Sequence, residues 1–144
     1  MTAPFGARLA RVRARMADLG VEVLLLSVGA DLPWLCGYEA MPLERLTMLV
    51  VPVDGDATLV VPALEAPRVV ERPDVFTMRP WGETEDPVEL VVGLSGPARV
   101  AAVGDRTWAR FVVDLQAALP ATRLTRGAAA TGPLPAVTDA QRAL

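Results

Sequence analysis

Residues 46–62 read LTMLVVPVDGDATLVVP, and this stretch decides the fold. Two apolar runs rich in Val and Leu, residues 46–53 and 57–61, flank the tripeptide Asp54-Gly55-Asp56, and Pro62 ends the second run. An Asp-Gly pair between two such runs predicts a β-hairpin, because Gly tolerates the positive φ angle of a tight turn. The centre of the chain therefore predicts two adjacent antiparallel strands.

Upstream of the hairpin, the sequence predicts one helix and one buried strand. Apolar residues of segment 5–19 recur at steps of three and four, at Leu9, Val12, Met16 and Leu19. Gly20 is the expected helix stop, and the Arg residues of this helix lie mostly off the apolar stripe, on a face expected to be solvated. Residues 21–27 are almost continuously apolar, which suits a strand covered on both faces. Residues 29–33 are expected to form a loop.

Downstream of the hairpin, helical and extended patterns alternate. We expect a helix at 63–72 interrupted by Pro67, an exposed edge strand at 74–79, a loop at 81–87, a helix at 88–94, a strand at 99–103, a helix at 107–119 capped by Asp105 or Thr107, and a strand at 121–125. The chain therefore predicts an α/β domain of three layers, in which helices flank a six-stranded mixed sheet with one β-hairpin. We assign residues 1–126 to this domain and residues 127–144, rich in Gly, Ala, Thr and Pro, to a linker.

Composition excludes several kinds of site. All 14 basic residues are Arg, His is absent, and the formal net charge is −3. A chain without His holds no Ser-His-Asp triad and no His metal ligand, and an acidic chain is a poor nucleic-acid binder. The single cysteine, Cys36, forms no internal disulfide and is expected to be a small buried residue in a reducing cytoplasm. No segment predicts a membrane span or a secretion signal.

Residues 31–45 contain the densest group of unusual side chains. Trp34-Leu35-Cys36-Gly37-Tyr38 places two aromatic rings around a Gly, which suits a ligand pocket, a subunit interface or ordinary burial, and we favour burial. Arg45 is a candidate to bind a carboxylate, or to pair with Asp31 and order the loop. Three carboxylates in the segment 81–86 suit a cation site, but a solvated loop is the favoured interpretation.

Taken in order, these segments resemble the amino-terminal domain of the creatinase, prolidase and aminopeptidase P family of metallopeptidases. The matching pieces are Leu19-Gly20-Val21-Glu22, Asp31, Trp34-Leu35-Cys36-Gly37-Tyr38, Arg45, Leu49-Val50-Val51-Pro52, and Leu59-Val60-Val61-Pro62 with Leu64-Glu65. The sequence departs from the family pattern at Glu22, Trp34 and Cys36, where Asp, Tyr and Thr are more usual, and in the altered charges of 134–142.

The resemblance implies a non-catalytic domain that mediates dimerisation and roofs the active site of an enzyme cleaving Xaa-Pro peptide bonds. Two divalent metals, manganese, cobalt or zinc, are then expected in a separate catalytic domain, and none in this chain. The expected partners are that catalytic domain, a second subunit and a short proline-containing peptide, with no nucleic acid and no membrane. Asp31, Trp34, Tyr38 and Arg45 become the candidates for a substrate rim or an interface.

Two other functions stay open on the sequence. The altered segment 134–142 favours a free-standing small-molecule or protein binding module derived from this family. A small α/β nucleotide-binding enzyme is the second alternative, although neither Gly-rich stretch has the spacing of a phosphate-binding loop.

Overall fold

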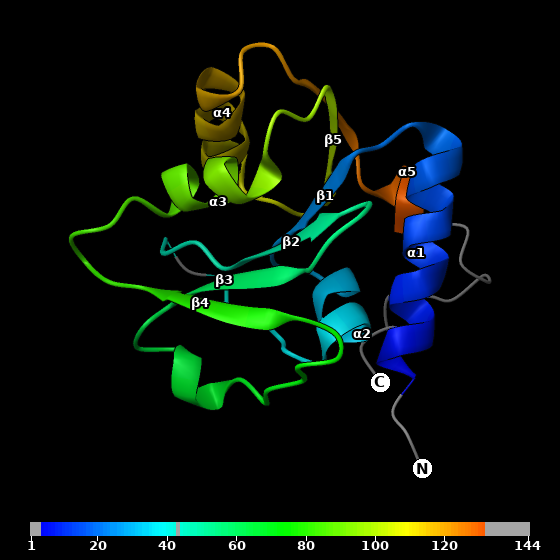
Figure 1. Cartoon of the computed structure of the whole chain (residues 1–144). Coiled ribbons are helices and arrows are strands. Elements are labelled where there is room, and N and C mark those ends of the chain that lie inside the picture. Colours follow the sequence, from blue (N-terminus) through cyan, green and yellow to red (C-terminus); the bar gives the residue numbers. More distant parts are fainter. Residues whose placement is uncertain (1–3, 43, 132–144) are drawn as a thin grey trace.

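The computed structural model describes residues 4–42 and 44–131, which form a three-layer α/β fold (Figure 1). The elements are α1 (Phe5–Leu19), β1 (Val23–Leu26), α2 (Asp31–Cys36), β2 (Met48–Pro52), β3 (Thr58–Pro62), the 3-10 helix η1 (Ala66–Arg68), β4 (Thr77–Trp81), α3 (Pro87–Ser95), β5 (Val100–Val103), α4 (Ala109–Ala118), β6 (Arg123–Arg126) and α5 (Ala128–Thr131). The predicted fold class is confirmed.

The described strands form one six-stranded mixed sheet in the order β4-β3-β2-β1-β5-β6. The predicted hairpin is confirmed, since β2 and β3 pair antiparallel with Leu49 opposite Leu59, and Gly55 in the connection has a φ of 121°. β1 pairs antiparallel with β2 and parallel with β5. β2 therefore runs against the other strands of the sheet, as a hairpin inserted into an otherwise parallel arrangement requires.

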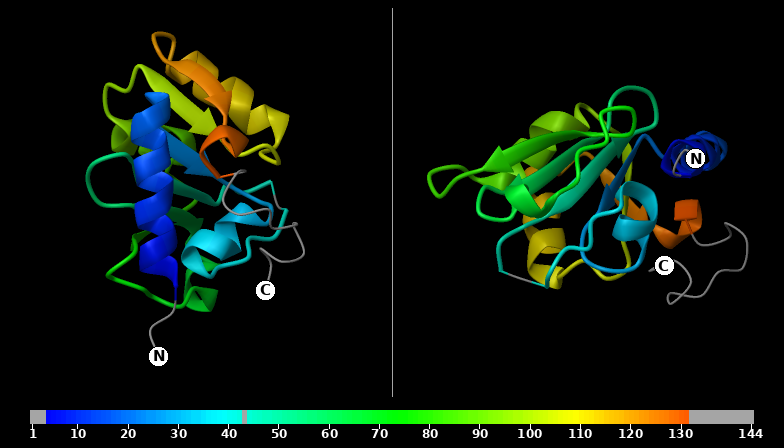
Figure 2. Two further views of the ribbon diagram at one scale, coloured as in Figure 1. Left: turned by 90° about the vertical axis from the view of Figure 1, so that its right-hand side faces the viewer. Right: turned by 90° about the horizontal axis from the view of Figure 1, so that it is seen from below.

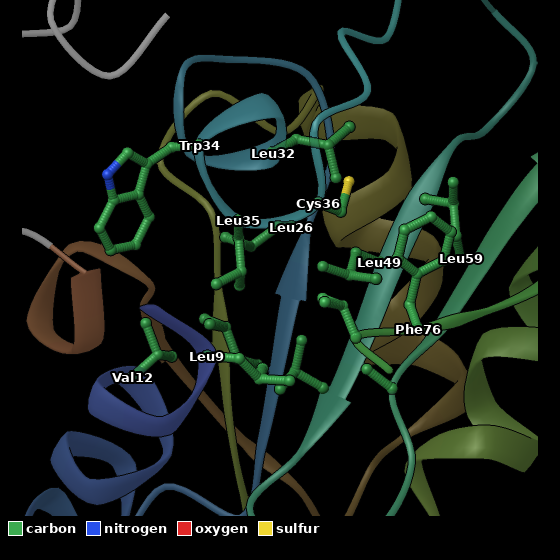
Figure 3. Packing of buried hydrophobic residues seen from close by; sticks show 14 of the residues in the cluster. Leu9, Val12, Leu26, Leu32, Trp34, Leu35, Cys36, Leu49, Leu59 and Phe76 are labelled. Carbon is green, nitrogen blue, oxygen red and sulfur yellow. The ribbon is translucent and has the colours of Figure 1, made fainter. Parts of the chain in front are cut away.

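Alternating side chains along the strands feed two apolar cores. Leu24 and Leu26 of β1 join the core beneath α1, α2 and α5, whereas Val23 and Leu25 join the core beneath α3 and α4. Both views of Figure 2 place α1, α2 and α5 together on one side of the sheet. Figure 3 shows the first core from close by, with Leu9 and Val12 of α1 approaching Leu26 and Leu35. All four residues of β1 are buried, as its apolar run predicts.

Three segments differ from the sequence prediction. Residues 31–36, expected within a loop, form α2, whose left-handed C-cap Gly37 donates its N–H to the Pro33 oxygen. The helix expected at 63–72 is only the short η1, because Pro67 removes a backbone donor and Val69 is already extended. The expected linker begins with a helix, α5, at 128–131; the remainder of that segment, 132–144, lies outside the described residues, so the domain boundary stays a prediction.

β4 is confirmed as an edge strand, at residues 77–81 instead of 74–79. Its parallel pairing with β3 turns the backbone of Thr77 and Trp81 inward, since Thr77 N–H donates to the Ala57 oxygen and the Trp81 oxygen accepts from Ala63 N–H. The alternating geometry turns the peptide groups of Met78 and Pro80 outward. Pro80 has no N–H, and its oxygen accepts a hydrogen bond from the Arg79 side chain.

Three arginine residues of α1, namely Arg8, Arg13 and Arg15, donate hydrogen bonds to carbonyl groups of other segments. Arg8 Nη1 donates to the Trp34 oxygen over 2.7 Å, and Arg15 Nε donates to the Ala129 oxygen over 3.3 Å. Arg13 donates to the oxygens of Pro52 and Gly55 in the hairpin. The predicted solvated face is confirmed, since Arg11 and Arg15 are exposed, and the cations on it also attach α1 to three separate segments.

Aromatic and guanidinium groups stack where α1 meets α2. The Arg8 guanidinium lies 5.1 Å from the centre of the Trp34 ring and 5.6 Å from the centre of the Phe5 ring. The Arg72 guanidinium lies 4.3 Å from the centre of the same Phe5 ring. Arg72 Nε also donates to the Cys36 oxygen. A Cβ atom on Gly37 would lie 2.9 Å from the Arg72 guanidinium and 3.2 Å from the Phe5 ring, so a side chain here would displace Arg72, and the φ of 82° itself favours Gly.

Cys36 is buried, as the sequence predicts. Burial raises the pKa of its thiol to about 11, an effect that outweighs the hydrogen bond from the Tyr38 backbone and the charge of Arg72. The thiol is therefore protonated at neutral pH and does not act as a nucleophile there. Among the described residues, no helix combines the length and apolar character needed to cross a bilayer.

Replacing Gly37 with Ala should destabilise the fold more than the same change at Gly20. Both residues adopt left-handed backbone angles, with φ of 82° and 70°, but nothing lies within 4 Å of a Cβ on Gly20. We expect about 1–2 kcal/mol of destabilisation at Gly20 from the backbone alone and a larger loss at Gly37. Urea unfolding of the two variants measures the difference, and equal losses would show that the contact with Arg72 contributes nothing.

Stability should fall in alkali because of Cys36. The unfolded chain releases the thiol proton near pH 8.5, whereas the folded protein keeps it until about pH 11, so the unfolded state binds fewer protons in this window. The free energy of unfolding should therefore drop between about pH 8.5 and 11, by up to about 3 kcal/mol. Urea unfolding at pH 8 and pH 10.5 should show a smaller drop for Cys36→Ala; parallel drops would contradict this assignment. Tyr38, whose pKa burial also raises, is present in both proteins.

Candidate functional site

The four rim candidates do not form one cluster. Asp31 Oδ2 accepts a hydrogen bond of 2.8 Å from Thr131 Oγ1, and Arg45 forms a 2.8 Å ion pair with Glu83. The alternative expectation that Arg45 pairs with Asp31 is therefore wrong. Trp34 and Tyr38 are 5% and 8% exposed, so the favoured interpretation of this motif as ordinary burial is confirmed. In Figure 3 the Trp34 ring lies at the side of α2 nearest α5.

The carboxylates of the acidic segment 81–86 are paired with arginine side chains and backbone N–H groups. Glu85 accepts hydrogen bonds from Arg79 and from the Gly82 N–H, and the bond from Arg79 is the main cause that lowers the Glu85 pKa. Asp86 caps α3 by accepting from the Val88 N–H over 2.9 Å. Together with the Glu83 ion pair to Arg45, these contacts engage all three carboxylates, which favours the loop interpretation over a cation site.

A crevice opens where the parallel strands β1 and β5 end. β1 continues into α2 on one face of the sheet and β5 continues towards α4 on the other, so the two connections diverge at this point. In open α/β sheets such a divergence at the carboxyl ends of strands is the usual position for a binding site. The cavity here measures about 170 Å³ and is lined by Leu26, Ser27, Val28, Gly29, Ala30, Asp31, Gly104, Asp105, Arg106 and Ala128.

Charged side chains at this edge are held in fixed pairs. Asp105 Oδ2 lies 2.6 Å from Arg126 Nη2, and this hydrogen bond is the main cause that lowers the Asp105 pKa and raises that of Arg126. The expected capping of α4 by Asp105 or Thr107 is wrong, because the N-cap position belongs to Trp108 and lacks a side-chain bond. Both partners keep their charges at neutral pH, which suits binding or docking better than proton transfer.

Sequence reasoning missed most of this edge. Of the crevice residues, it had singled out Asp31 as a site candidate. Gly29, with a φ of 124°, and Gly104 follow the ends of β1 and β5, and position after a buried parallel strand is the signal that points to them. Arg106 covers Gly29, because a Cβ on that Gly would lie 3.3 Å from its side chain.

The residues described do not fit a metal centre. Within residues 4–42 and 44–131, no group of three or more Cys, Asp or Glu side chains is arranged to hold an ion. The two metals implied by the family resemblance therefore have no fitting ligand set in this part of the chain.

Curated sequences and solved structures resemble the chain over most of its length. Probable dipeptidase PepE of Mycobacterium tuberculosis is 35% identical over 119 residues, which make up 80% of this chain and 32% of that protein. The crystal structure of dipeptidase PepE from Mycobacterium ulcerans superposes with a TM-score of 0.82 at 31% identity, over 91% of this chain and 36% of that one. The chain thus spans about a third of the length of these relatives.

More distant structures share the fold. A prolidase from Thermococcus sibiricus matches with a TM-score of 0.78 at 18% identity, over 93% of this chain and 37% of that one. The creatinase/prolidase N-terminal domain of an X-Pro dipeptidase from Streptococcus pyogenes matches with a TM-score of 0.71 at 23% identity, over 84% of this chain and 93% of that one.

The family model described as Creatinase/Prolidase N-terminal domain matches residues 8–142, nearly the whole chain. The same layered sheet recurs in the solved structures, and the motif around Gly37 occupies the junction of α1 and α2. The chain therefore belongs to the creatinase/prolidase N-terminal domain family.

Proposed function

We propose that this chain is the non-catalytic amino-terminal domain of a dinuclear-metal Xaa-Pro dipeptidase or aminopeptidase, and that it roofs the active site and contributes to a homodimer. One observation carries the proposal: the family match extends over residues 8–142, yet the chain spans only about a third of the PepE relatives. The remaining length of such proteins is where a catalytic domain would lie.

The chemistry of the described residues supports a non-catalytic role. The chain contains no His, and its single thiol is buried with a raised pKa, so neither a His base nor a thiolate is at hand. The manganese, cobalt or zinc ions of the proposed parent enzyme would be held by its catalytic domain. A single buried thiol fits a reducing compartment, and we place the protein in the cytoplasm on that ground.

The carboxyl edge of the sheet is the proposed rim. The Arg45 side chain is 43% exposed and pairs with the more exposed carboxylate of Glu83, so its guanidinium would bind a peptide carboxylate or a partner subunit by exchanging this partner. Trp34 and Tyr38 are buried in the core, where they support α2 and the loop that follows it, and so contribute to this rim indirectly. Asp31 stands at the crevice end of the same segment.

The purified 144-residue chain should not hydrolyse Xaa-Pro dipeptides. It lacks a fitting metal site over the described residues, so adding manganese should release no amino acid above the blank. A longer polypeptide, which contains this chain and continues past Leu144 in the same reading frame, should release the amino acid in the same assay. Metal-dependent hydrolysis by the short chain would contradict the proposal.

The reading frame also separates the alternatives. If it stops at Leu144, the free-standing binding module replaces the roof domain as the best function. A nucleotide-binding enzyme would instead show a large, saturable rise in melting temperature with nucleotides.

Arg45→Ala should weaken substrate binding in the longer enzyme. Loss of an exposed guanidinium contact should raise KM about five- to tenfold with a small change in kcat. The matched control is Arg99→Ala, because Arg99 is also exposed and ion-paired, to Glu22, but precedes β5 at the opposite edge of the sheet. Equal KM values for the two variants would show that Arg45 does not contact the substrate.

A further inference from the structure

The last described helix, α5, owes its position to contacts with the rest of the fold. It comprises only residues 128–131, far fewer than an isolated helix needs to persist in water. Ala130 and Thr131 are nevertheless 0% and 1% exposed. Specific contacts must therefore hold this segment in place.

A backbone contact holds the start of α5. The Gly127 N–H donates to the Val103 oxygen at the end of β5 over 2.6 Å. A Cβ on Gly127 would lie 3.0 Å from backbone atoms of Gly104 and Val103, so this position tolerates only Gly without a shift of the main chain. The contact fixes the origin of α5 against β5.

Side chains from two other elements hold the remainder of α5. Arg15 of α1 donates to the Ala129 oxygen over 3.3 Å, in an exposed position. Thr131 Oγ1 lies 2.8 Å from Asp31 Oδ2, and the two residues are 100 positions apart in the sequence. The second contact is the stronger one, because its acceptor is a carboxylate and its donor residue is buried.

Asp31 is suited to this role by its place in the fold. It begins α2 directly after the loop that follows β1, and its side chain lines the crevice together with Ala128 of α5. A carboxylate in the first turn of a helix is also favourable for the helix dipole. One residue thus joins α2, the crevice and α5.

We propose that Asp31 is a positioning residue that fixes α5 on the fold, and with it the direction in which the chain leaves the domain. Under the proposed function, on which this last step rests, the same contact helps to set the position of this domain over the active site of the catalytic domain. Asp31 then acts through Thr131 and touches no substrate.

Hydrogen exchange of the 144-residue chain tests the contact directly. Asp31→Ala and Thr131→Val should each raise exchange at the amides of residues 130 and 131 roughly fivefold. Each change removes the shared hydrogen bond between Thr131 and Asp31, and Thr131→Val also removes the 3.3 Å bond from the Thr131 hydroxyl to the Gly127 oxygen. The double variant should therefore exchange more slowly than the product of the two single effects predicts. Thr131→Ser keeps the hydroxyl and should restore slow exchange.

The matched control is Thr122→Val. Thr122 is also a buried threonine, and its hydroxyl donates over 2.7 Å to the Ala98 oxygen, away from α5. This variant should speed exchange at the amides of β1, which open by global unfolding, while leaving exchange at residues 130 and 131 unchanged. Unchanged exchange at residues 130 and 131 in Asp31→Ala or Thr131→Val overturns the proposal, as does additive behaviour in the double variant.

The role of Asp31 and the proposed function are tested by different measurements, so the failure of one can be told from the failure of the other. The exchange experiment needs no peptidase activity, so it judges the role of Asp31 even if the longer polypeptide is inactive. In an active longer enzyme, Thr131→Val should lower kcat/KM severalfold and Thr131→Ser should recover it, whereas Thr122→Val should leave it unchanged below the melting temperature.

Discussion

β1 is the strand on which both cores depend. Its four residues point alternately into the two apolar clusters, and its backbone pairs with β2 on one side and β5 on the other. A polar side chain at any of these positions would be buried without a partner, at a cost of about 1–3 kcal/mol. The loops that leave the carboxyl ends of β1 and β5 are held on this rigid base, and the crevice lies between them.

The sequence predicted those elements whose pattern is local. The hairpin, the buried strand β1 and the helices α3 and α4 each carry their own period or turn signal, and each was placed within a few residues. α2 was missed because it is only six residues long and includes Pro33, and its stability comes from burying Leu32 and Leu35. α5 was missed because its Ala and Thr residues form no apolar stripe.

The site was harder to predict than the fold, because its contacts are distant in the sequence. Asp31 was rightly singled out as unusual, but its partner Thr131 lies 100 residues away, and Arg45 meets Glu83 at a separation of 38. No local spacing encodes such pairs. Burial of Trp34 and Tyr38 was the favoured interpretation because aromatic residues beside a Gly commonly pack inside a fold. The crevice itself appears only once the order of the strands is known.

The outward-facing backbone of β4 also limits how the protein associates. An open sheet edge ordinarily invites another chain to add a strand, but Pro80 supplies no donor and the Arg79 guanidinium already occupies its oxygen. A neighbouring molecule would find an interrupted hydrogen-bonding ladder at that border. Growth of the sheet from chain to chain, the route towards fibrous aggregates, is thereby discouraged at β4, and a specific partner has to recognise side chains instead.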